Sequence, residues 1–76
     1  MKELLKSLDD ILAILEKTKE TSRKMIYESG EKDTAMDFLN VCHNINRAER
    51  CVYDTMTALI NVCVREQRKD AEQCEN

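Results

Sequence analysis

Apolar residues between positions 3 and 28 recur at spacings that alternate between three and four, which is the pattern of an amphipathic α-helix. The first stripe consists of Leu4, Leu8, Ile11, Leu15, Thr18, Ser22 and Met25. A second stripe runs beside it and consists of Leu5, Leu12 and Ile26, with Ile14 on the other flank. This apolar surface is wider than a two-stranded coiled coil requires, so we expect the first helix, residues 3–28, to contact more than one neighbouring helix.

Residues 29–33 interrupt the pattern and predict a turn. They contain Gly30, the only glycine of a chain that has no proline. A glycine can end a helix by taking the left-handed conformation, and Asp33 or Thr34 can cap the helix that follows. Thr34 with Asp37 three residues later also fits the capping-box pattern.

The helical pattern then resumes and predicts a second helix over residues 34–68, followed by a frayed tail at 69–76. Its apolar stripe consists of Phe38, Val41, Ile45, Ala48, Val52, Thr55, Leu59 and Val62. His43, Asn44 and Asn46 are poor helix formers in the middle of this pattern. A kink, or a break into three helices, near Asn44 is therefore the alternative to one continuous helix.

These elements predict an all-α chain with one domain, residues 1–76, folded as an antiparallel helical hairpin. The first helix is roughly 40 Å long and the second over 50 Å, so pairing them about Gly30 places Leu59 and Ile60 beside the start of the first helix. The chain after Cys63 then overhangs, and residues 58–64 are apolar on nearly every side.

An overhanging apolar segment favours burial against another chain, so we expect a homodimer that forms a four-helix bundle. The residues expected in the dimer interface are Leu5, Leu12, Leu59, Ile60, Cys63 and Val64. The alternative is a monomer in which a third helix folds back over the hairpin.

Composition narrows the classes of function. Charged residues make up 36% of the chain and hydrophobic residues 42%, and the helical spacing of the latter favours a folded chain over a disordered one. The net charge of −3, from 15 acids and 12 bases that are interleaved, counts against a nonspecific nucleic-acid binder. The longest uncharged run, between Asp54 and Arg65, is too short to cross a bilayer as a helix. The charged amphipathic stretch after Met1 lacks the features of a signal peptide, which predicts a cytoplasmic protein with reduced cysteines.

The four cysteines do not have the spacing of a metal site or of a disulfide framework. Cys42, Cys51, Cys63 and Cys74 are separated by nine, twelve and eleven positions, whereas zinc ligands come in closely spaced pairs. A double-disulfide hairpin would need a turn within residues 52–62, where no helix breaker occurs. We expect Cys42 and Cys63 to be small buried residues, Cys51 to be half-buried at an interface, and Cys74 to carry an exposed thiol.

No residue pattern indicates catalysis, a metal or a cofactor. His43 follows Cys42, but adjacent helical side chains point about 100° apart and cannot form a nucleophile–base pair. The carboxylates lie on polar faces, and the chain has no glycine-rich phosphate loop. We therefore expect no cofactor, no metal, no catalytic residue and no enzymatic activity.

The outer face of the second helix is the candidate surface for a protein partner, because it combines arginines, amides and a tyrosine, which are typical of binding hot spots. It consists of Asn40, His43, Arg47, Arg50, Tyr53 and Asp54. The alternative surface is the acidic one of the first helix, which consists of Asp9, Asp10, Glu16 and Glu20.

In plan the chain resembles the small dimeric helical-hairpin regulators of the Rop type, which bind RNA, although no residue motif is shared. In size, acidity and lack of catalytic groups it is similar to small accessory inhibitors made by bacteriophages, which block host protein complexes. The first resemblance implies a nucleic-acid-binding hairpin dimer, and the second a protein-binding regulator or inhibitor. We expect the second, with nucleic acid as the alternative partner.

Overall fold

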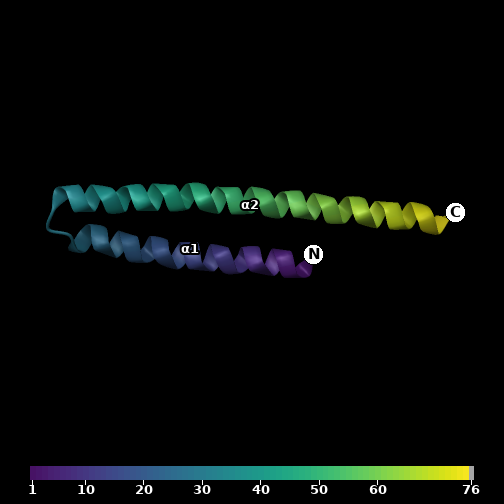
Figure 1. Ribbon diagram of the computed structural model, residues 1–76, viewed down its shortest axis with the longest axis horizontal. Coiled ribbons are helices and arrows are strands. Elements are labelled where there is room, and N and C mark those ends of the chain that lie inside the picture. The colour runs from purple at the N-terminus through teal and green to yellow at the C-terminus, as the bar shows by residue number, and fades with distance from the viewer. Residues whose placement is uncertain (76) are drawn as a thin grey trace.

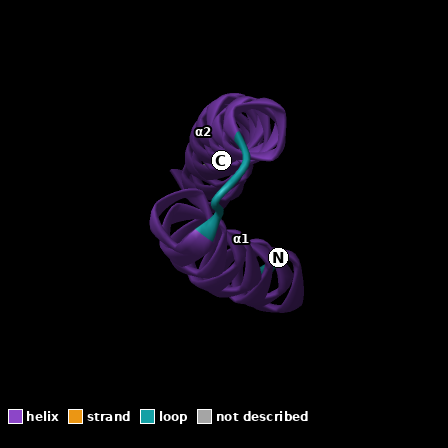
Figure 2. Cartoon of the chain, turned by 90° about the vertical axis from the view of Figure 1, so that its left-hand side faces the viewer, coloured by secondary structure: helices purple, strands orange, loops and turns teal. Residues whose placement is uncertain are grey.

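The chain forms two antiparallel helices, α1 (Lys2–Glu28) and α2 (Lys32–Glu75). They are described by a computed structural model that covers the backbone of residues 1–75 and the side-chain surroundings of residues 1–69. Figure 1 shows the helices side by side over the length of α1, and the end-on view of Figure 2 shows the same pair. The molecule measures 70 × 16 × 10 Å. The predicted all-α hairpin is confirmed, and no third helix folds back within residues 1–75.

The second helix is longer than the sequence pattern predicted. It begins at Lys32 rather than Thr34, passes through Asn44 without a break, and ends at Glu75 rather than near Arg68. The absence of glycine and proline after Gly30 explains this continuity, because no residue in this stretch interrupts the backbone hydrogen bonds. The predicted tail from 69 therefore continues the helix, and residue 76 lies outside the described part of the chain.

The turn is formed differently from the prediction. Gly30 does not have a positive φ, so it does not end α1 in the left-handed conformation. Instead Ser29, with φ −70° and ψ 126°, leaves the helix in extended conformation while its N–H donates to the carbonyl of Met25 at 3.0 Å. Because α2 starts at Lys32, Glu31 rather than Asp33 or Thr34 precedes it, and the Thr34 hydroxyl donates to the Glu31 carboxylate at 3.1 Å.

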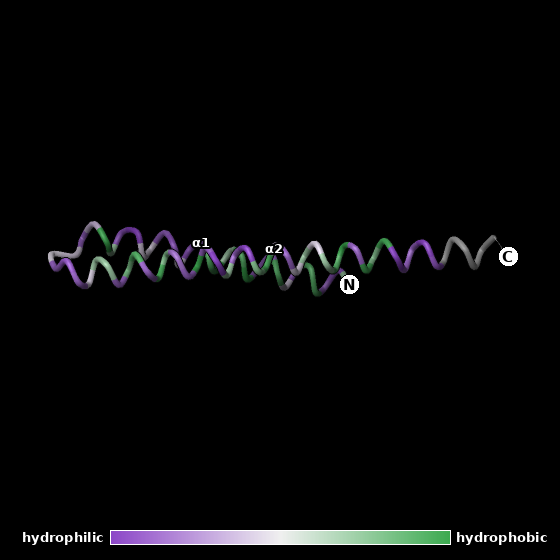
Figure 3. The backbone as a smooth tube through the Cα atoms, turned by 90° about the horizontal axis from the view of Figure 1, so that it is seen from above, coloured by the Kyte–Doolittle hydropathy of each residue, from purple (hydrophilic) through white to green (hydrophobic). Residues whose placement is uncertain are grey.

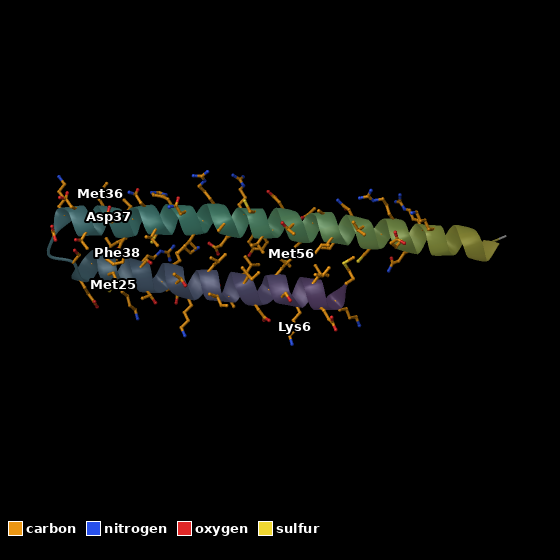
Figure 4. All side chains as sticks on the ribbon, viewed as in Figure 1. Lys6, Met25, Met36, Asp37, Phe38 and Met56 are labelled. Atoms are coloured by element: carbon orange, nitrogen blue, oxygen red, sulfur yellow. The ribbon has the colours of Figure 1, made fainter. Side chains whose placement is uncertain are left out.

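The seam between the helices combines the second apolar stripe of α1, Leu5, Leu12 and Ile26, with three members of the first stripe, Leu8, Leu15 and the buried Ser22. The Cys42 thiol donates to the Lys19 carbonyl at 3.9 Å, which places these two residues opposite each other. In an antiparallel pair, Ile26 then lies opposite Ala35, Leu12 opposite Glu49, and Leu5 opposite Met56. All eight are buried or half-buried, and Figure 4 shows Phe38 and Met56 on the side of α2 that faces α1.

This seam corrects the stripe expected for α2. Phe38, Ile45, Val52 and Leu59 do face α1, but Cys42, Glu49, Met56 and Cys63 take the alternate positions. Val41, Thr55 and Val62 remain exposed on one side. These alternate positions of α2 are one residue later in the sequence than the predicted ones. The polar contacts of Lys19 across the seam favour this rotation of α2, because the Lys19 ammonium donates to Asn46 Oδ1 at 3.1 Å and to Glu49 Oε1 at 2.6 Å.

Two helices alone bury little of this chain. Only Cys42, Ile45 and Ser22 fall below one tenth exposure among residues 1–69, and the total accessible surface is 6408 Å². A compact monomer of this 8.9 kDa mass would expose about 4,800 Å². The hairpin therefore has a thin core and an unusually large exposed surface.

The predicted overhang is present at the open end of the hairpin. The C-terminal part of α2 extends well past the start of α1 in Figure 1. In Figure 3 the hydrophobic colouring of α2 continues beyond the N-terminus before polar residues take over. Ile60, Val62 and Val64 are exposed in this region. Because α1 begins at Lys2, the apolar residues of α2 beyond this point have no part of α1 beside them.

Candidate protein-binding surfaces

The cysteines are distributed along α2. Cys42 is buried, Cys63 is half-buried and Cys51 is exposed, and all three are free thiols. The burial predicted for Cys42 is confirmed. Cys51 is exposed within the single chain because α1 does not cover its side of α2, and its burial at an interface stays a prediction. The prediction for the Cys74 thiol lies outside the described side chains. In residues 1–69, no cluster of three or more His, Cys, Asp or Glu side chains could hold a metal ion.

The outer face of α2 is formed by the six residues predicted to bind a partner, and we call it the Arg47 face. Its members are Asn40, His43, Arg47, Arg50, Tyr53 and Asp54, and all are exposed. Nitrogen-tipped side chains project from α2 away from α1 in Figure 4. Within the described residues, none of the six side chains makes a hydrogen bond or an ion pair. Their polar groups are therefore free to contact another molecule.

The residues predicted to form a dimer interface fall into two groups. Leu5, Leu12 and Leu59 are half-buried and line the seam between α1 and α2, and Cys63 is half-buried just beyond it. These side chains are largely committed to contacts within the chain. Ile60 and Val64 are exposed near the overhang. The dimer interface stays a prediction, and of its six predicted residues only Ile60 and Val64 are exposed.

A second surface emerges once the seam is known, because the residues just before each seam position of α1 and α2 flank the same side of the hairpin. Rotating an antiparallel helix pair by 180° about the normal to the plane of the two helices exchanges the helices but leaves the same side facing the viewer. Equivalent positions of the two helices therefore lie on the same side. None of the residues on this side carries a charge, and we call it the charge-free face. It comprises Leu4, Ser7, Ile11, Ile14, Thr18, Thr21 and Met25 of α1 and Val41, Asn44, Ala48, Cys51, Thr55, Ala58 and Val62 of α2.

The charge-free face is accessible along its length. Ile14 is 65% exposed, and Leu4, Ile11, Met25 and Val41 are also exposed. The hydroxyl of Thr18 donates to the carbonyl of Ile14 at 2.8 Å, as other threonines of α1 and α2 do to the preceding turn. Donation to the backbone lowers the cost of covering these hydroxyls by another protein. Charged residues appear only at the ends of the face, where Glu28 and Asp37 lie near the turn and Arg65 at the open end.

The rim of the charge-free face on α1 has an ordered distribution of charge. The residues one further step round the helix are Glu3, Asp10, Lys17 and Lys24. The N-terminal half of this rim is therefore acidic and the C-terminal half basic. All four side chains are exposed, and within residues 1–69 none of them takes part in an ion pair.

Sequence reasoning found the two apolar stripes of α1 but not the charge-free face. The sequence alone does not show which residues form the seam. The charge-free face can be recognised only when Leu5 and Cys42 are placed in the seam and Leu4 and Val41 outside it. A signal was present, since charges are absent from two neighbouring positions of each heptad between residues 4 and 25 of α1 and between residues 41 and 62 of α2.

A shallow depression of about 140 Å³ lies at the open end of the hairpin and is lined by Val62, Arg65, Glu66 and Lys69. It is open to solvent and holds an exposed ion pair between Lys69 and Glu66 at 3.9 Å.

Within the described residues, neither helix has a stretch that is both long and apolar enough to cross a membrane. No protein-family model, curated protein or solved structure compared with the chain matches it.

Proposed function

We propose that this protein is a non-enzymatic, protein-binding regulator or inhibitor that works as a homodimer with a four-helix core. The observation that carries the proposal is the large exposed apolar surface of a hairpin that buries so few of its own side chains. Such a surface favours association with protein, since apolar area removed from water contributes about 25 cal/mol per Å².

The excess surface supports the dimer. The chain exposes 6408 Å², which is about 1,600 Å² more than a compact monomer of its mass. A stable protein–protein interface removes about 800 Å² from each partner. A second hairpin on one side of the molecule would therefore cover an area of the right order and still leave other surfaces free for a further partner.

The Arg47 face supports a separate protein partner. Arg47 and Arg50 are three residues apart, so their guanidinium groups can reach one acidic or carbonyl-rich surface together. Tyr53 is 58% exposed beside them and adds rigid apolar area. The three side chains lie outside the seam, so they can bind without disturbing the packing of α1 on α2.

The experiment is a binding measurement with a partner captured from lysate of the source cell. Replacing Arg47 and Arg50 by Ala should weaken binding by about 2 kcal/mol or more, while the circular-dichroism melt stays nearly unchanged. The matched control is the pair Arg65→Ala with Arg68→Ala, which removes the same charges at the same spacing elsewhere on α2 and should leave binding close to wild type.

The outcome that would contradict this assignment is normal binding by the Arg47 and Arg50 variant. If Asp9→Lys with Asp10→Lys then abolishes the complex, the acidic surface of α1 binds the partner. Nucleic acid is the second candidate partner, and it is favoured because Arg47 and Arg50 form no ion pair with any residue in the range 1–69. Binding of RNA or DNA neutralises many phosphates, so it would weaken far more steeply with added salt than a protein contact made by Arg47, Arg50 and Tyr53.

We also propose a cytoplasmic location. The support is the placement of Cys42, Cys51 and Cys63 along one continuous helix, where they cannot pair with one another within the chain. Cysteines that form no disulfide framework fit a reducing compartment.

A further inference from the structure

We infer that a second copy of the chain docks on the charge-free face, with the two α1 helices antiparallel and the twofold axis near Ile14. This inference rests on the proposed dimer and specifies its contact surface and arrangement. It differs from the interface expected from the sequence, which consisted of Leu5, Leu12, Leu59, Ile60, Cys63 and Val64.

Burial of the charge-free face would remove no ionised group from water along the length of α1. Charged groups are costly to bury unless they are paired, and the other flank of α1 carries Asp9, Glu16 and Arg23. The two flanks therefore differ in the free energy needed to dehydrate them. Ile14 lies near the middle of α1 and is 65% exposed, so the described residues of its own chain leave most of this side chain uncovered.

Charge on the rim selects a second copy as the occupant. An antiparallel α1 pair centred beside Ile14 places Glu3 opposite Lys24 of the second copy and Asp10 opposite Lys17 of the second copy. Twofold symmetry repeats both pairs, so all four rim charges meet an opposite charge. A parallel pair would instead place each rim charge beside its own like charge. Opposite charges at this spacing stabilise helical contacts, and like charges destabilise them.

The apolar positions fit the same axis. Ile14 meets Ile14 of the second copy, Ser7 faces Thr21, and Leu4 faces Met25. Large side chains therefore lie opposite large ones, and small side chains lie opposite small ones. On α2 the same symmetry brings Asn44 opposite Cys51. It also places the rim residue Arg47 beside Arg47 of the second copy, a like-charge contact that the four opposite-charge contacts of the α1 rims outnumber. The two Arg47 faces then lie side by side on the outside of the bundle, and the overhang stays uncovered beyond the turn of the second copy.

The first test compares three lysine substitutions by sedimentation equilibrium, with circular dichroism to verify that each variant is helical. Ile14→Lys should raise the dimer dissociation constant at least about tenfold. Leu39→Lys, a matched change of an exposed apolar residue on the opposite flank of α2, should leave the dissociation constant near wild type. Ile60→Lys should also leave it near wild type. Loss of the dimer with Ile60→Lys but not with Ile14→Lys would overturn the inference while keeping the proposed dimer.

A monomeric wild-type chain would instead contradict the dimer itself, so the two failures are distinguishable.

The second test uses charge reversal to examine the antiparallel arrangement. Glu3→Lys with Asp10→Lys makes the rim wholly basic, and Lys17→Glu with Lys24→Glu makes it wholly acidic. Each variant alone should dimerise about tenfold more weakly, and an equimolar mixture should form heterodimers at near wild-type strength. Unchanged self-association of both variants would overturn the arrangement.

The native thiols provide a readout that needs no substitution. Cys51 is exposed on the charge-free face, so its alkylation by iodoacetamide should slow as protein concentration rises and the dimer forms. Mass spectrometry separates its labelling from that of the other cysteines. A Cys51 labelling rate that is the same in dimeric wild type and in Ile14→Lys would contradict coverage of this face.

Discussion

At the scale of single residues, the seam is unusual for its polar layer. The Lys19 ammonium lies between Asn46 and Glu49, and the Lys19 and Glu49 side chains are only 15% and 16% exposed. A half-buried ion pair of this kind contributes little net stability, but it disfavours other pairings of the two helices. It therefore favours the rotation of α1 in which the Leu5 stripe lies in the seam, while Leu4, Ile11, Thr18 and Met25 of the first stripe stay exposed.

Removing one partner of this pair should be costly. Glu49→Ala leaves the Lys19 ammonium partly buried with one acceptor fewer, so the free energy of unfolding should fall by about 1–3 kcal/mol. Replacing both residues, Lys19→Met with Glu49→Leu, should bring the stability back near wild type. Urea denaturation measures both, with Glu66→Ala as the control because its pair with Lys69 is exposed. A loss for Glu49→Ala no larger than that of the control would show that the pair is unimportant.

The cysteines provide a second residue-scale prediction. Cys42, Cys51 and Cys63 lie along one continuous helix, so their thiols cannot converge on one metal ion or bond to each other. The melting temperature should therefore stay the same with a reductant or with a chelator, as followed by circular dichroism. A decrease of more than a few degrees with either reagent would mean that Cys74 or another chain supplies a bond or a ligand.

At the scale of the elements, the turn is less constrained than its glycine suggests. Gly30 is exposed and does not have a positive φ, and a Cβ atom added at this position would have no neighbouring atom within 4 Å. The hydrogen bonds of Ser29 with Glu31 hold the connection instead, since the Ser29 hydroxyl donates to the Glu31 carbonyl at 3.0 Å.

Gly30→Ala should therefore be tolerated. Alanine restricts the unfolded chain, so the free energy of unfolding should rise by about 0.4–1 kcal/mol. Urea denaturation of the variant beside wild type measures the change. A destabilisation of about 1 kcal/mol or more would indicate that the turn requires a conformation that only glycine adopts easily.

The sequence predicted the elements well and their contacts less well. The period of apolar residues and the breaker at Gly30 were enough for two helices, a hairpin and an overhang. The seam was not predictable from apolar character alone, because Leu4 and Leu5, or Val41 and Cys42, are equally suited to burial. Lys19 and Glu49 decided the choice, and a charged residue at a seam position is recognisable only when its partner on the other helix is known.

The helix end was mispredicted for a related reason. Polar residues after Arg68 suggested fraying, yet Ala71, Glu72 and Gln73 are strong helix formers and no breaker stops α2 before Glu75. Of the candidate surfaces, the Arg47 face followed directly from residue type and helical spacing. The charge-free face did not, because it depends on how two helices are rotated against each other.

At the scale of the whole molecule, one elongated hairpin has two different exposed sides. The charge-free face is suited to a second copy, and the Arg47 face to another partner. Both assignments depend on a chain that does not bury its apolar surface alone, since only Cys42, Ile45 and Ser22 are buried among residues 1–69. Association between two copies of the chain would cover this apolar surface.

Sedimentation equilibrium at micromolar concentration tests this association most directly. The dimer predicts a mass twice that of the 8.9 kDa chain, because the apolar residues exposed on one hairpin are covered by the other. The mass should fall toward that of one chain on dilution, with a loss of helical signal if the hairpin depends on its partner. A stable, fully helical species near 8.9 kDa at the highest concentration would contradict the account.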